Sequence, residues 1–341
     1  MHSRALILAL TALFTSLAVG QTVTQPLTTR VFRLSQAESP RDMNEMVVVV
    51  RTIAEVNVPT APDVERGAIP LRGTPGQVAL AEWLLNQLDQ PVPSSHQPAV
   101  YDFEEAKRDP AVRVFRLATI ETPQGLNEVT TALRTIADVQ RVLPYPAQRA
   151  IIVRGTPGQA ALVEWLLNQL DQPASPVHGS ATYHFDEPGD DPAVLVFRLA
   201  NVETGQDLQE ITNAMRVIAD VHKVVPYAVQ GAVIMRGTAD QMAMAEWLVG
   251  ELDQPAGGNS ALSQDAAGHE FQVTGTDQIV HVFHFAGSTT AQQFVDIATQ
   301  ARRTQKLEQV YICYSQRALS VRGTLDQIAL TEQLIQEMMK P

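Results

Sequence analysis

Polar residues that recur along the chain are the first candidates for chemistry. Arg154, Gln159 and Glu164 each have counterparts at three other places in the sequence. A guanidinium, an amide and a carboxylate could together bind or protonate a substrate. A catalytic site repeated four times in one chain is rare, however, whereas a structural requirement repeated four times is ordinary. No Gly-x-Ser-x-Gly, His-Glu-x-x-His or Walker sequence is present. We therefore expect that this protein is not an enzyme.

The residues that could hold a metal are also poorly placed. His281 and His284 fall on one expected strand, where residues three apart point to opposite faces. Cys313 is the single cysteine, which excludes an intrachain disulfide and a zinc site built on cysteines. One linker holds a cluster of acidic residues, Asp186, Glu187, Asp190 and Asp191. Their spacing matches no known calcium loop, so we expect a solvated loop and neither metal nor cofactor.

The net charge and the sequence context both argue against a nucleic-acid ligand. The segment from Gly155 to Gly158 matches the Gly-x-x-Gly loop of KH domains. That loop joins two helices, whereas this segment joins an expected strand to a helix. Proteins that bind nucleic acid neutralise phosphates with Lys and Arg, and this chain carries a net charge of −12. We expect no nucleic-acid partner.

The chain contains four copies of one pattern. Arg-Gly-Thr begins at Arg72, Arg154, Arg236 and Arg322, with spacings of 82, 82 and 86 residues. An upstream phenylalanine recurs with almost the same period, at Phe32, Phe115, Phe197 and Phe283. Two independent landmarks with one period indicate internal duplication.

The second copy shows the expected elements most clearly. Residues 112–117, 139–145 and 150–153 are rich in β-forming residues and predict three strands. Helices are expected from Thr122 and from Thr156. Thr156 and Gln159 have the spacing of a capping box, and Gly155 suits a tight turn that needs an unusual φ. The order predicts a small α+β module, βαββα.

We therefore predict a signal peptide followed by a tandem array of four modules. The modules are 28–91, 110–173, 192–255 and 279–341. The linkers are 92–109, 174–191 and 256–278. Each of the first three modules ends in Leu-Asp-Gln-Pro, where proline stops the helix. The linkers contain short strand-like pieces, so they are either flexible tethers or edge strands that dock on the next module.

Tryptophan and arginine are the expected interface residues. Trp83, Trp165 and Trp247 lie on the back of the second helix of their modules, and the fourth copy has Gln333 there. Such a tryptophan packs between neighbouring copies or against a partner chain, or else a wider core encloses it. The junction arginines Arg72, Arg154, Arg236 and Arg322 are the other candidates. Arg154 could pair with Asp171, although the fourth copy lacks that acid.

The N-terminus has the features of a signal peptide at residues 1–20. Arg4 precedes an apolar run from Leu6 to Val19, which ends in small residues before Gln21. The run is short for a membrane span. We expect cleavage after Gly20, no membrane span after cleavage, and a periplasmic or otherwise exported protein; an uncleaved anchor is the alternative.

The repeat resembles a known family. The residues that carry the resemblance are 114–117, 151–156 and 166–173, with their echoes in the other copies. They look like the periplasmic N-domain repeat of bacterial secretins, the NolW-like module. The resemblance implies a KH-like, ring-building type of fold that stacks and binds secretion or pilus components. The sequence ends at Pro341 directly after the fourth copy, so we expect no segment that forms an outer-membrane barrel.

These observations predict an exported protein–protein interaction or assembly protein, accessory to a secretion or pilus system. Its partners would be envelope proteins or further copies of itself. The alternative is an envelope module that binds a cell-wall glycan or another polymer through the same tryptophans and arginines.

Overall fold

A computed structural model describes residues 26–35, 39–91, 97–106, 108–173, 179–185, 191–202, 204–254, 270–285 and 287–339. The signal peptide expected at residues 1–20 and three of the four clustered acids, Asp186, Glu187 and Asp190, lie outside these residues. Within them the protein is a mixed α+β structure with eight helices and four small antiparallel sheets. We call each sheet with its two helices a unit. None of the described helices is long and apolar enough to cross a membrane.

Unit 1 has two strands and two helices. They are β1 (Thr28–Arg33), α1 (Pro40–Ile53), β2 (Ala68–Gly73) and α2 (Pro75–Leu88). The third strand expected here is missing, and only bridges at Asn57 and Asp63 remain. Pro59 and Pro62 lack the N–H groups that a strand ladder needs. Fifteen positions separate Asn57 from its partner Arg72, against thirteen for the corresponding pair in unit 2, so the segment also bulges.

Units 2, 3 and 4 each have four strands. Unit 2 contains β3 (Ala99–Asp102), β4 (Ala111–Arg116), α3 (Pro123–Ile136), β5 (Arg141–Tyr145), β6 (Ala150–Gly155) and α4 (Pro157–Leu170). Unit 3 contains β7 (Gly179–His184), β8 (Ala193–Arg198), α5 (Gly205–Val217), β9 (Lys223–Tyr227), β10 (Ala232–Gly237) and α6 (Ala239–Leu252). Unit 4 contains β11 (Glu270–Gln272), β12 (Gln278–His284), α7 (Ala291–Thr304), β13 (Gln309–Cys313), β14 (Ala318–Thr324) and α8 (Leu325–Met338).

The linkers supply the first strand of each of these sheets. In unit 2 the strand order is β3-β4-β6-β5, and units 3 and 4 have the same order. Strand β3 pairs antiparallel with β4, from Ala99 opposite Val114 to Asp102 opposite Ala111. Of the two alternatives for the linkers, the docked edge strand is therefore the one found in β3, β7 and β11.

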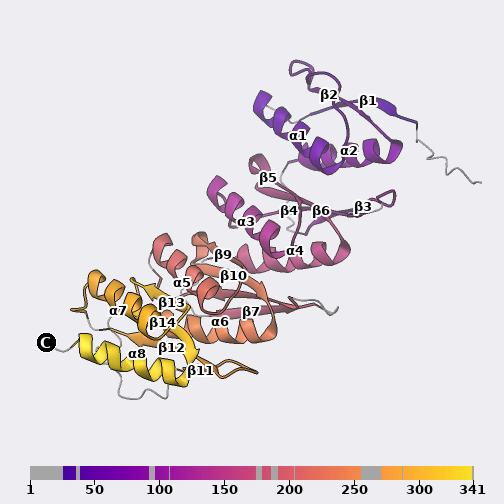
Figure 1. Ribbon diagram of the computed structural model, residues 1–341. Helices are drawn as coiled ribbons and strands as arrows, with labels where there is room; N and C mark the ends of the chain where they lie inside the picture. The colour runs from indigo at the N-terminus through magenta and orange to yellow at the C-terminus, as the bar shows by residue number, and fades with distance from the viewer. Residues whose placement is uncertain are drawn as a thin grey trace, which may run out of the picture.

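The units stack so that layers of sheet and helix alternate along a rod (Figure 1). The sheets of units 2, 3 and 4 each turn one face to their own helices and the other to the helices of the preceding unit. Ile151 and Val153 of β6 join the core of unit 2, whereas Ala150 and Ile152 on the opposite face join the core of unit 1. Burial of apolar area is the main stabilising force in such layers. Three of the four described cores draw on two consecutive units, so these cores run across the junctions, whereas the fourth consists of unit 4 residues alone.

Capping boxes begin the second helix of every unit, as the sequence predicts. In α4, Gln159 N donates to Thr156 Oγ1 at 3.2 Å, and Thr156 N donates to Gln159 Oε1 at 2.9 Å. The expected role of Gly155 is wrong, because its φ is not in the left-handed region. A Cβ at Gly155 would stand 2.7 Å from Gln159 Oε1. The glycine is therefore needed for space beside the capping glutamine.

Candidate interaction sites at the junctions between units

The junction arginines reach across to the preceding unit. Arg154 Nη1 donates to Ile53 O at the end of α1 at 2.5 Å, and it lies 3.4 Å from Glu55 Oε2. Arg236 repeats the contact at the next junction, with Ile136 O at 3.0 Å. The last four carbonyls of a helix have no partner within the helix, and they carry the negative end of its dipole. A buried guanidinium is a suitable donor for them.

The exposure of these arginines differs between the junctions and unit 1. Arg154 is 3% exposed, whereas Arg72 at the same place in β2 is exposed, because no described unit precedes unit 1. Burial lowers the pKa of Arg154, and the nearby Glu55 opposes that shift. The Phe103 ring lies 5.0 Å from the guanidinium carbon. The pairing of Arg154 with Asp171 considered from the sequence is not found; Asp171 instead accepts backbone N–H groups from its own unit.

A second set of donors holds the end of the other helix. Gln148 Nε2 donates to Leu88 O and to Gln90 O, the latter at 2.8 Å, just beyond α2. Arg116 Nη2 donates to Gln87 O at 2.6 Å. Thus the outer face of the unit 2 sheet caps both helices of unit 1.

The sequence analysis missed this glutamine, although it recurs. Gln230 donates to Leu170 O at 2.6 Å, and Gln316, in the amide orientation that satisfies both carbonyls, donates to Leu252 O at 3.0 Å. Unit 1 has Arg66 at this place, and no described helix precedes unit 1. A residue shared by copies two to four and absent from copy one is the signal that could have identified it.

The tryptophans lie at the same junctions. The Trp83 ring of α2 is centred 5.2 Å from Tyr101 of β3, and Trp165 of α4 is 5.4 Å from Tyr183 of β7. Trp247 of α6 is 5.7 Å from Phe271 of β11. Each tryptophan therefore contacts the edge strand of the next sheet and is partly buried. These contacts cover part of each tryptophan ring, so less of the ring is accessible to a glycan.

A glutamate that recurs on the first helix of units 1, 2 and 3 accepts a backbone N–H from the next unit at two junctions. Glu128 accepts from Ala228 N at 2.9 Å, and Glu210 accepts from Ser315 N at 2.9 Å. At the first junction the facing residue is Pro146, which has no N–H. Glu45 therefore pairs with Arg41 at 3.0 Å.

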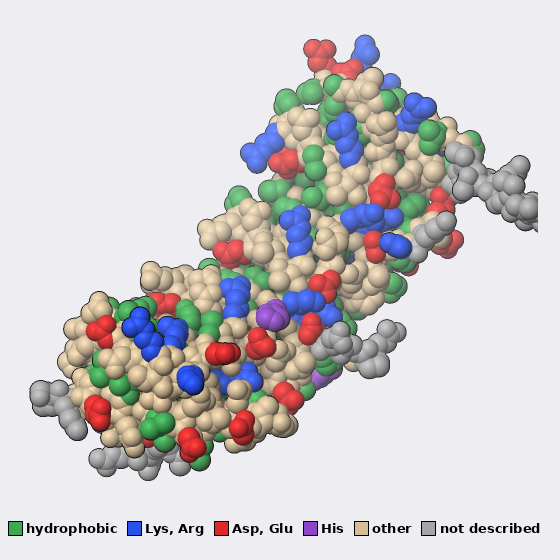
Figure 2. Space-filling model, viewed as in Figure 1, with side chains coloured by type: hydrophobic (Ala, Val, Ile, Leu, Met, Phe, Trp, Pro, Cys, Tyr) green, Lys and Arg blue, Asp and Glu red, His purple; other side chains and the backbone are tan. Residues whose placement is uncertain are grey.

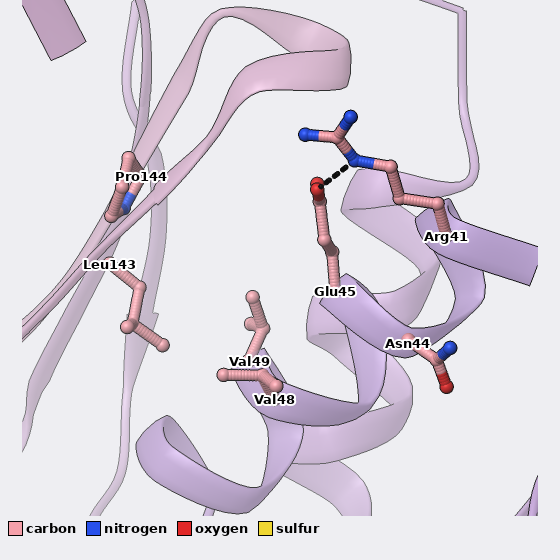
Figure 3. A pocket seen from close by; sticks show the side chains of 7 residues that line it. All are labelled: Arg41, Asn44, Glu45, Val48, Val49, Leu143 and Pro144. Atoms are coloured by element: carbon pink, nitrogen blue, oxygen red, sulfur yellow. Dashed lines mark hydrogen bonds and ion pairs between the residues drawn. The ribbon is translucent and has the colours of Figure 1, made fainter. Parts of the chain in front are cut away.

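A groove opens beside this ion pair, between α1 and β5 (Figure 3). Its volume is about 490 Å³, and its apolar walls include Val48, Val49, Leu143 and Pro144. Val48 is 50% exposed. The corresponding groove at the second junction has fewer apolar residues in its walls, with Thr131 in place of Val48.

The other titratable candidates do not converge. His281 lies 3.5 Å from Glu270, and His284 lies 3.8 Å from Glu251 of the preceding unit. Cys313 is buried in the junction between units 3 and 4, and burial raises the pKa of its thiol to about 12. The part of the chain that the structure describes has no group of three or more His, Cys, Asp or Glu side chains that could hold a metal ion. Acidic and basic side chains are interspersed on the face shown in Figure 2.

Comparison with known proteins gives matches among solved structures. No protein-family model matches the chain, and no curated protein does. The N-terminal domain of the secretin XcpQ from Pseudomonas aeruginosa is 20% identical over 43% of this chain and 62% of that chain, with a TM-score of 0.18. A structure of XcpQN012 is 18% identical over 67% of this chain and 100% of its own, with a TM-score of 0.23.

A third match is the ETEC pilotin–secretin complex of AspS and GspD. It is 12% identical, covers 91% of this chain and 54% of that chain, and has a TM-score of 0.17. This chain is thus similar to secretin N-terminal domains, the family that its sequence motifs resemble.

Proposed function

We propose that this protein is an exported, non-enzymatic assembly protein whose four modules form one stiff rod for contacts with envelope proteins. One observation carries the proposal: the side chains at two recurring positions, those of Arg154 and Gln148, join one unit to the next. Arg154 and Gln148 hold the helix ends of unit 1, and Arg236 and Gln230 hold those of unit 2. A chain whose units are held together by such contacts is stiff, and a stiff chain is suited to spacing and positioning other proteins.

The connection with secretion or pilus systems is the finer part of the proposal. It is supported by the motif resemblance to secretin N-domain repeats and by the signal peptide expected at residues 1–20. In this role the sides of the rod and its two ends are the surfaces available to partners.

The test combines partner capture with size analysis. The mature full chain, immobilised by a C-terminal tag, is incubated with envelope fractions, and bound proteins are identified after cross-linking. We expect specific enrichment of envelope proteins or self-association. A strictly monomeric chain that captures nothing contradicts the assembly role.

Stiffness has its own test. Small-angle scattering should give the maximum dimension of an extended rod, and a Trp165→Gln variant should lose cooperativity between units 2 and 3. Unchanged cooperativity in that variant would show that the Trp165–Tyr183 contact does not couple the units. Sedimentation with purified cell wall distinguishes the glycan-binding alternative.

A further inference from the structure

The outer face of the unit 1 sheet carries arginines at the same positions as the sheets at the junctions. No described helix pair packs on this face. Strands β1 and β2 place Thr29 opposite Arg72, Val31 opposite Pro70 and Arg33 opposite Ala68. The corresponding residues in unit 2 are Val112, Val114, Arg116, Ala150, Ile152 and Arg154. All six are buried, at 6% exposure or less. In unit 1, by contrast, Val31 is 61% exposed.

Both helix-capping arginines are retained on this face. Arg116 and Arg154 of unit 2 donate to carbonyls at the ends of α2 and α1. Arg33 and Arg72 occupy the same register positions in unit 1 and are exposed. Within the chain, every other described arginine at the Arg72 position binds the last carbonyls of a helix in a preceding unit. The three internal junctions therefore define what fits this face: a pair of helix C-termini.

The opposite end of the rod does not have the charge to fill this role. The residue just after the first helix of each unit has a φ between 54° and 57°, and it is Glu55, Asp138, Asp220 or Lys306. The acids of units 1 and 2 pair with the next unit's arginine, as Asp138 does with Arg236 at 2.9 Å. In unit 4 the residue is Lys306, which would meet Arg72 of a second copy as a like charge.

The side of α7 also differs from the helices that bind a following sheet. Ala132 of α3 and Ala214 of α5 are fully buried against their neighbours. The corresponding residue of α7 is Gln300, which is exposed. End-to-end stacking of two identical chains is therefore disfavoured by charge and by polarity.

We propose that the outer face of the unit 1 sheet binds the C-terminal ends of a helix pair in a partner protein, one that carries an acidic residue directly after the first helix. Arg72 binds that helix end and the acid, and Arg33 binds the end of the second helix. This inference rests on the proposed assembly role, for which it names one docking surface. The sheet of unit 1 has two strands, so the interface is smaller than the internal junctions and belongs to the weak class.

The experiment uses the chain's own helix pair as the probe. A full-length donor carries Gln300→Ala, Arg303→Thr and Lys306→Asp, which copy Ala132, Thr135 and Asp138 onto α7. It also carries Arg72→Ala, so that it does not polymerise. The acceptor is the wild-type chain, and complex formation is measured by sedimentation velocity. We expect the donor to bind the acceptor, whereas a donor with the Arg72→Ala change alone does not.

An acceptor with Arg33→Ala and Arg72→Ala should bind about tenfold or more weakly. The matched control is Arg30→Ala, on the other face of β1, where the arginine pairs with Glu82 of its own unit; it should leave binding unchanged. Absence of binding, or binding that the double variant does not weaken, overturns the proposal. Self-association of the wild-type chain that the double variant abolishes would identify a second copy as the occupant and also overturn it. Since this assay needs no envelope partner, its failure is distinguishable from failure of the capture experiment.

Discussion

Replacing Arg154 by methionine should weaken the junction between units 1 and 2 far more than the same change at Arg72. Methionine keeps much of the apolar stem and removes the charged donors. Arg154 donates to Ile53 O at 2.5 Å and to Asp109 O at 3.1 Å, and its side chain is 3% exposed. A hydrogen bond to a charged group contributes about 1.5–3 kcal/mol, and each carbonyl loses its donor in the variant.

Part of this loss is offset because the buried guanidinium no longer has to be desolvated, the same effect that lowers the pKa of Arg154. We therefore expect a net loss of about 2–4 kcal/mol in the free energy of unfolding of the transition that contains unit 2. Arg72→Met changes an exposed residue and should cost within about 0.5 kcal/mol. Arg154→Lys, which keeps the charge and loses the planar fork, should fall between the two.

Urea unfolding followed by circular dichroism measures these differences. The Arg154→Met curve should separate into two transitions as units 1 and 2 uncouple, while the Arg72→Met curve should overlay the wild type. The reasoning is refuted if both variants lose equal stability, or if Arg154→Met costs less than about 1 kcal/mol.

Three further changes test separate parts of the structure. Gln230→Ala should lower the free energy of unfolding by about 1–3 kcal/mol, because two helix-end carbonyls lose their donor, whereas Arg66→Ala should not; thermal denaturation compares them. Gly155→Ala should cost about 1 kcal/mol by disturbing the capping box, while Gly158→Ala, whose Cβ meets nothing within 4 Å, should be neutral or stabilising; an equal loss in both would contradict the steric argument. The Cys313 thiol should resist a thiol reagent at pH 8. Because burial raises its pKa from 9.0 to about 12, its contribution to stability is complete below pH 9 and is lost as pH rises towards 12, and Cys313→Ala should flatten the decline of the unfolding midpoint over that range.

The sequence predicts the α+β class and the helix starts well, because their determinants are local. The four Thr–Gln capping boxes are confirmed in α2, α4, α6 and α8. The missing strand of unit 1 also has a local cause that a closer reading of Pro59 and Pro62 could have found. Local signals of this kind can be interpreted without knowledge of the neighbouring units.

The junction contacts were harder to predict because half of each contact is backbone. Arg154 and Gln148 bind carbonyl oxygens, which every residue has, so the residue type does not reveal which residues supply these oxygens. The recurrence of Arg154 marks it as a candidate interface residue, but nothing in the sequence identifies the Ile53 carbonyl as its partner. Gln148 could be identified only by comparing copies two to four with the first copy. The first copy has Arg66 at this position, and this difference marks Gln148 as a contact between units.

The direction of the stacking has a consequence for the order in which the chain folds. Every junction places the helices of one unit against the sheet of the unit that follows it, so the cores of units 1, 2 and 3 are completed by residues that the ribosome makes later. When unit 1 has just been synthesised, Ala150 and Ile152 of its core do not yet exist. The carbonyl groups at the helix ends of the newest unit therefore lack their side-chain donors until about one more repeat has been synthesised. We therefore expect the units to become stable in order from the N-terminus, each when the sheet of the next unit packs on its helices.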